Sequence, residues 1–189
     1  MRSYIYLADQ ISTWMGKSFA WCIVILTSSV AVEVFMRYVF NAPTLWAFDF
    51  TIQMYGAMFM MAGAYSLCTQ SHVKADMLYR FLKTRTQATI DLVLYFIFFF
   101  PACLAFSYQG YKYAKTAWIV KETSWSSPAQ IQIYMFKSLI PIAGILLVIQ
   151  GVAEVFRCII ALKEGSWPIR EIEEEETEKL LVKQSSKKK

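Results

Sequence analysis

The stretch FAWCIVILTSSVAVEVF, residues 19–35, is a run of apolar side chains in which Glu33 carries the only charge. An α-helix that crosses the hydrocarbon core of a bilayer needs about 20 mostly apolar residues. Extended on both sides, the run covers residues 18–40 and gains one further charge, Arg37. This length and composition predict a membrane-spanning helix.

A cleaved signal peptide is the alternative interpretation of this run, because the basic residues Arg2 and Lys17 precede it. The run is longer than the ~7–15 apolar residues of a signal-peptide core. A charged segment, Glu33 to Arg37, also stands where a cleavage site would be expected. The spanning helix is therefore favoured.

Three further apolar runs are long enough to span a bilayer, at residues 45–68, 90–110 and 128–160. Pro101 lies inside the third run, where neighbouring helices can satisfy the carbonyl that proline leaves unpaired. Ser127 followed by Pro128 is a helix-start signal, and it predicts that the fourth helix begins there. The sequence thus predicts an all-α integral membrane protein of about four transmembrane helices.

The composition of the whole chain agrees with this fold class. Of its 189 residues, 57% are hydrophobic and 17% are charged, which is too apolar for a soluble domain of this size. The net charge is +5, but the basic residues form short clusters between the apolar runs instead of one surface for nucleic acid. Membrane lipids are the expected partner, and nucleic acid is not.

Basic residues between the runs predict the orientation, because cytoplasmic loops carry an excess of lysine and arginine. The link between the second and third runs and the C-terminal part of the chain are both basic, and we place both in the cytoplasm. An even number of crossings places the N-terminus there too. The residues that carry this argument are Lys74, Arg80, Lys83 and Arg85, then Arg157, Lys163 and Arg170.

The link between the third and fourth runs is the exception to this rule, because its lysines would face outward. Lysine mixed with aromatic residues is typical of a segment that lies in the headgroup layer, so we expect an interfacial amphipathic segment here. Residues 1–165 then form the membrane domain, and residues 166–189 form a charged cytoplasmic tail. The residues of the link are Lys112, Lys115, Lys121, Tyr111, Tyr113, Trp118 and Trp125.

Cysteine and histidine give little sign of a metal or haem site. The four cysteines show no CxxC spacing, and His72 is the only histidine. Haem in small membrane subunits usually needs paired axial ligands from the interior of a bundle. We expect no cofactor in this chain.

Glycines recur every seven residues in two of the runs. Gly56 and Gly63 form one small-residue face, and Gly144 and Gly151 form another. Such faces allow helices in lipid to approach closely, where van der Waals contact replaces the hydrophobic drive. They predict association, either within this chain or with another chain.

Charge inside a membrane costs several kcal/mol unless it is paired. Glu33 and Arg37 stand at i and i+4, in the favourable order for a helical ion pair. We interpret them as a structural ion pair at the outer face of the membrane that the chain spans. Asp49 is the nearest other carboxylate, across a short turn. A proton or ion pathway would need further carboxylates in mid-membrane.

Two segments carry a family resemblance: RYVFNAPTLWAFD, from Arg37 to Asp49, and HVKADMLYRFL, from His72 to Leu82. An arginine, aromatic and asparagine turn followed by a His-Val-x-x-Asp loop resembles the small membrane subunit of tripartite ATP-independent periplasmic (TRAP) transporters, the DctQ-like family. Asp49 stands where that family commonly has glutamate. The candidate structural or subunit-interface residues are Glu33, Arg37, Asn41, Trp46, Asp49, His72, Asp76, Gly56, Gly63, Gly144 and Gly151.

The resemblance implies a transport subunit and not an enzyme. It implies a large permease subunit as partner, which holds the substrate and sodium sites, and a periplasmic binding protein that delivers a substrate, typically an organic acid. This chain would scaffold the large subunit in the inner membrane of a bacterium or archaeon, with both termini in the cytoplasm. No residue here would then encode the substrate.

Two other functions remain open from the residues alone. A small transporter that assembles from identical chains would need an intramembrane carboxylate facing a cavity, and Glu33 is the candidate. A membrane anchor of a redox complex would need haem or quinone ligands.

Overall fold

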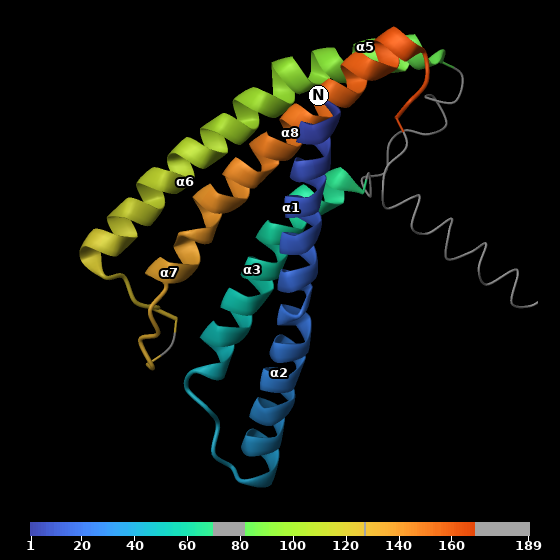
Figure 1. Ribbon diagram of the computed structural model, residues 1–189. Coiled ribbons are helices and arrows are strands. Elements are labelled where there is room, and N and C mark those ends of the chain that lie inside the picture. The colour runs from blue at the N-terminus through green and yellow to red at the C-terminus, as the bar shows by residue number, and fades with distance from the viewer. Residues whose placement is uncertain (70–81, 127, 169–189) are drawn as a thin grey trace, which may run out of the picture.

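The computed structural model describes residues 1–69, 82–126 and 128–168, and the regular structure of these residues is helical. One isolated antiparallel bridge joins Thr123 to Gln132. The prediction of an all-α protein is confirmed. In chain order (Figure 1), the elements are α1 (Arg2–Ala20), α2 (Cys22–Val39), α3 (Ala47–Cys68), α5 (Thr84–Leu94), the π-helical turn η1 (Tyr95–Phe99), α6 (Phe100–Val120), α7 (Tyr134–Lys137) and α8 (Leu139–Glu164).

Three helical segments are long and apolar enough to cross a membrane: Arg2–Val39, Thr84–Val120 and Tyr134–Glu164, with 38, 37 and 31 residues. A rise of 1.5 Å per residue makes them roughly 46 to 57 Å long, well beyond the ~30 Å of the hydrocarbon core. They must therefore tilt or extend past the apolar layer. The α3 helix, with 22 residues, is long enough but is not among the segments of this apolar content. A fourth crossing stays a prediction.

The first helix begins at Arg2, sixteen residues before the apolar run that starts at residue 18. It continues into α2 with a single non-helical residue, Trp21. A buried stripe at spacings of three and four explains the extension, because it packs α1 against α3 and α8. The stripe contains polar residues, so hydropathy does not mark it: it consists of Ile5, Ala8, Asp9, Ser12 and Gly16.

The fourth helix does not begin at Pro128, and that prediction was wrong. Residues 122–126 and 128–133 form a hairpin-like turn, in which the Ser124 N–H donates to the Ile131 carbonyl at 2.8 Å and the Ile133 N–H donates to the Glu122 carbonyl at 3.1 Å. This pairing occupies the backbone groups that a helix would need, and α7 begins only at Tyr134. Ser127 lies outside the described residues.

The segment expected to lie in the headgroup layer is not a separate element of the structure. Residues 111–120 simply continue α6, which ends where Lys121 adopts a left-handed backbone with φ of 48°. The aromatic and lysine side chains of this region are therefore carried on the end of a long helix and on the hairpin-like turn that follows.

The helices form an open row instead of a closed bundle. The α8 helix lies at the centre and packs against α1, α3, α5 and α6, whereas α2 packs on α3 and slightly on α1. Figure 1 shows α6 and α2 at the two flanks, with α1 laid beside α3 and α8. All three buried apolar clusters contain α8 residues, and most of these are alanines or other small side chains: Ala153 and Ile160, Leu146, and Cys158 and Ala161.

Close packing on α8 depends on glycine. A Cβ atom on Gly144 would stand 3.1 Å from the backbone Cα of Ser107 in α6. We expect Gly144→Ala to lower the free energy of unfolding by roughly 1–3 kcal/mol, because a backbone atom cannot move aside as a side chain can.

The matched control is Gly63→Ala, whose Cβ would meet Leu147 at an ordinary 3.6 Å. That change should be neutral or slightly stabilising through helix propensity. Modification of the buried cysteines by a thiol reagent during heating in detergent reports unfolding of each variant. Equal midpoints for the two variants would contradict the packing argument.

Candidate functional site

The segment from the end of α2 to the turn before α3 forms a cluster of hydrogen bonds around Glu33. Arg37 donates from Nη2 and Nε to Glu33 Oε1 at 2.7 and 3.2 Å, so the ion pair predicted from the i, i+4 spacing is present. Glu33 Oε2 accepts hydrogen bonds from the Thr44 N–H, at 3.0 Å, and from the Thr44 hydroxyl. The Glu33 side chain is 14% exposed and that of Arg37 is 56% exposed. Glu33 is thus the residue that fastens the α2 end to the turn.

Asn41 and Trp46 shape the turn itself. Asn41 has a φ of 48°, a left-handed conformation that asparagine tolerates better than most residues. The Ala42 N–H then turns back to donate to the Met36 carbonyl at 3.1 Å, which ends α2. Trp46 precedes α3, is half-exposed, and meets the Phe50 ring edge-on at 6.0 Å between centroids.

Asp49 is buried in the first turn of α3 and accepts a hydrogen bond from the Ser126 hydroxyl at 2.9 Å. Ser126 belongs to the hairpin-like turn after α6. This contact joins α3 to a segment 77 residues further along the chain. Sequence reasoning identified Asp49 but not its partner, because serine in a loop carries no distinguishing pattern.

A third polar contact holds the same hairpin-like turn to α7. Lys137 is buried, and its Nζ lies 2.5 Å from Glu122 Oε1 and 4.0 Å from the centre of the Tyr113 ring. Each connection at this end of the molecule is therefore tied by a charged residue: Glu33 for α2 to α3, Asp49 for α3 to the turn, and Lys137 for the turn to α7.

A buried polar network joins α1 to α8, and sequence reasoning missed it. Gln150 accepts a hydrogen bond from the Ser12 hydroxyl and donates to Asp9 Oδ1, both at 2.8 Å. Arg157 pairs through Nη2 with Asp9 and through Nη1 with Glu154. All five residues are at most 7% exposed.

The α3 helix also touches this network, because the thiol of Cys68 at its end hydrogen-bonds with Asp9. Arg157 was counted from the sequence among the basic residues of the cytoplasmic C-terminal part; the structure instead places it inside α8 with two carboxylate partners. The available signal was the spacing of Gln150, Glu154 and Arg157, which puts these three polar side chains on one helix face.

The glycine faces lie against helices of this same chain. Gly56 faces Phe136 and Gly63 faces Leu147, so this face of α3 meets α7 and α8. On α8, Gly144 faces Ser107 in α6, and a Cβ on Gly151 would clash with the Phe99 ring in η1. The faces therefore serve contacts within the chain.

His72 and Asp76 lie outside the described residues. Among residues 1–69, 82–126 and 128–168, no three histidine, cysteine, aspartate or glutamate side chains are arranged to hold a metal ion. The predicted site residues thus fall into three groups: a cluster at the turn between α2 and α3, the glycine faces of α3 and α8, and a segment outside the described residues.

We expect Arg157→Ala to lower the free energy of unfolding by about 3–5 kcal/mol, because it leaves two buried carboxylates without their cation. Arg2→Ala is the matched control: Arg2 pairs with Glu164 at 2.9 Å, but its side chain is 78% exposed, so the cost should be about 0–1 kcal/mol. Thermal unfolding in detergent measures both. A triple variant with Asp9→Asn, Glu154→Gln and Arg157→Gln should recover part of the loss, and similar midpoints for Arg157→Ala and Arg2→Ala would refute the argument.

The chain matches a protein-family model, and a comparison with curated proteins gives no match. The family model is described as "Tripartite ATP-independent periplasmic transporters, DctQ component" and matches residues 26–161. The match contains the Glu33 cluster, the hairpin-like turn and Arg157, and it begins after α1. Since it covers more than half of the chain, this protein belongs to the DctQ family of TRAP transporter components.

Proposed function

We propose that this small permease subunit acts as a scaffold for the large permease subunit of its TRAP transporter. The transporter would take up an organic acid, delivered by a periplasmic binding protein, in a sodium-coupled reaction whose substrate and ion sites lie in the large subunit. The observation that carries the proposal is the open row of helices.

The open row leaves apolar helix faces without a partner in this chain. In α2 only Ser29 is buried, and large apolar side chains such as Phe35 and Val39 are more than half exposed. On α3, the residues Phe48, Ile52, Tyr55 and Phe59 follow one another at helical spacing and are all exposed. Lipid can cover such surfaces, and so can another membrane protein. A subunit whose task is to widen a larger assembly needs faces of this kind.

A scaffold must also hold its shape, and contacts at both ends of the helix row support rigidity. The α8 helix is held by glycine contacts to α6, by alanine-rich clusters, and by the Arg157 network to α1. At the other end, Glu33, Asp49 and Lys137 fasten the connections. Well-packed interfaces resist continuous deformation, so the row can act as a fixed body.

A transporter assembled from copies of this chain is the alternative that the sequence left open. It would rely on Glu33, but the carboxylate oxygens of Glu33 are bonded to Arg37 and Thr44. A redox anchor would rely on haem or quinone ligation, which an absorption spectrum of the purified chain tests directly. Membership of the DctQ family favours the transporter subunit over both.

We further propose that the chain lies in the inner membrane with both termini in the cytoplasm. The start of α1 and the end of α8 lie at the same end of the molecule, where Arg2 pairs with Glu164 (Figure 1). If α3 also spans the membrane, the number of crossings is even, and both chain ends then lie on one side of the membrane. A reporter enzyme that is active only in the cytoplasm should therefore be active when fused after Lys189. Activity of a periplasm-specific reporter at the same position would overturn the orientation.

Association with the large subunit can be tested at the Glu33 cluster, which consists of Glu33, Arg37 and Thr44. Glu33→Ala removes the acceptor of both Thr44 and Arg37, whereas Arg37→Ala removes a half-exposed donor. We expect recovery of the large subunit by copurification to fall more with Glu33→Ala than with Arg37→Ala. Arg2→Ala, at the opposite end of the row, should leave recovery unchanged.

Liposomes that contain this chain alone should show no sodium-driven uptake of organic acids. Uptake by the chain alone would refute the scaffold proposal. Full recovery of the complex with Glu33→Ala, together with lost uptake, would instead assign Glu33 a direct role in transport.

A further inference from the structure

A groove of about 570 Å³ runs along α6 where the start of α8 packs against it. Phe106 lines the groove toward the start of α6, and Ile140 of α8 lies opposite Gly110. The remaining lining residues follow along α6 and are Gln109, Lys112, Tyr113 and Thr116. The apolar side chain of Phe106 thus lies at one end of the groove, and the polar side chains follow it along α6. From Phe106 to Lys112 the axial rise is about 9 Å.

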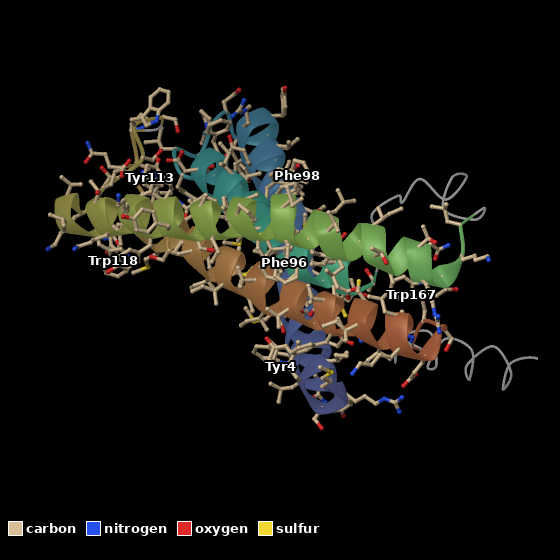
Figure 2. All side chains as sticks on the ribbon, turned by 90° about the horizontal axis from the view of Figure 1, so that it is seen from above. Tyr4, Phe96, Phe98, Tyr113, Trp118 and Trp167 are labelled. Atoms are coloured by element: carbon tan, nitrogen blue, oxygen red, sulfur yellow. The ribbon has the colours of Figure 1, made fainter. Side chains whose placement is uncertain are left out.

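The amino-acid composition of the helix also changes near Phe106. From Leu92 to Phe106 the chain is almost entirely apolar, and beyond Phe106 every turn of α6 carries tyrosine, tryptophan or lysine. Figure 2 shows Tyr113 and Trp118 together toward this end of α6, far from Trp167. Tyrosine and tryptophan concentrate at the boundary between hydrocarbon and headgroups. We therefore infer that the groove lies at that boundary, with Phe106 toward the hydrocarbon side.

Lys112 is a cation in this groove without an anion beside it. Its Nζ lies 4.3 Å from the centre of the Tyr108 ring, and no carboxylate of the described residues lies within ion-pair distance of it. Lys137, one turn into the next helix, contrasts with it, because Glu122 neutralises that lysine. An exposed lysine at headgroup depth can bind a phosphate and extend its apolar stem along the lipid.

We propose that the groove binds one anionic phospholipid of the phosphatidylglycerol class. The lipid phosphate lies against Lys112, with the Gln109 amide as a second donor, and an acyl chain lies over Phe106 and Ile140. Lipid fits the groove better than an acidic segment of a soluble protein, because Phe106 and Ile140 offer apolar contact to an acyl chain beside the Lys112 cation. This inference does not rest on the scaffold proposal.

The test uses the full-length chain in neutral detergent with phosphatidylglycerol, and native mass spectrometry measures the bound lipid. Lys112→Glu should reduce retention of phosphatidylglycerol on the order of tenfold, since it replaces attraction of the phosphate with repulsion. Lys112 is exposed, so folding should not suffer. The matched control is Lys115→Glu, an exposed lysine of the same helix turn that does not line the groove. It should retain wild-type binding.

Two control measurements distinguish binding of an anionic lipid from binding of any lipid or of free phosphate. Phosphatidylcholine, with the same chains but no net charge, should bind the wild type more weakly than phosphatidylglycerol, and inorganic phosphate should not displace the bound lipid. Equal losses for Lys112→Glu and Lys115→Glu would overturn the site, as would equal retention of the two lipids. Unchanged lipid binding in Lys112→Glu with lost docking of the binding protein would overturn it in favour of a protein contact.

Discussion

The ion pair between Arg157 of α8 and Asp9 of α1 is the interaction on which the arrangement of this chain depends. A guanidinium inside a helix row is stable only if carboxylates lie beside it, and Asp9 and Glu154 provide them. Asp9 is supplied by the helix that precedes the apolar part of the chain, so α1 must lie against α8. Gln150 and Ser12 complete the hydrogen bonding and fix the two helices in register. The network thereby links the first turns of the protein to α8.

The position of α8 at the centre of the row follows from its small residues. Glycine and alanine let α6, α3 and α1 approach three sides of one helix, which a helix of bulky side chains would prevent. The α3 helix packs against α1 and α2 as well as α8, and α2 and the outer face of α6 are left at the margins. An open row buries less apolar area than a closed bundle does in water, but lipid removes that disadvantage because exposed apolar faces cost nothing in hydrocarbon.

Polar residues carry a different task at each end of the row. At the α1 and α8 end they are buried within helices and hold two helices together. At the opposite end, Glu33, Asp49 and Lys137 fasten loops, where the backbone has fewer internal hydrogen bonds and needs side chains to define its path. Lys112 stands apart from both groups, since its partner in the protein is an aromatic ring. The charged residues of this small subunit thus either hold its helices and loops in place or, as we propose for Lys112, bind a lipid headgroup.

The sequence by itself determined the all-α membrane class, the Glu33 and Arg37 pair and the family, because apolar run length, i, i+4 spacing and short motifs are local properties. It did not reveal the helical start at Arg2, the turn that replaces a helix at Pro128, or the partners of Asp9 and Asp49. Each of these depends on residues far apart in the chain: Asp9 meets Arg157, and Asp49 meets Ser126. Hydropathy records how apolar a segment is, whereas a buried charge is decided by whether another helix brings a countercharge, and only the tertiary structure supplies that.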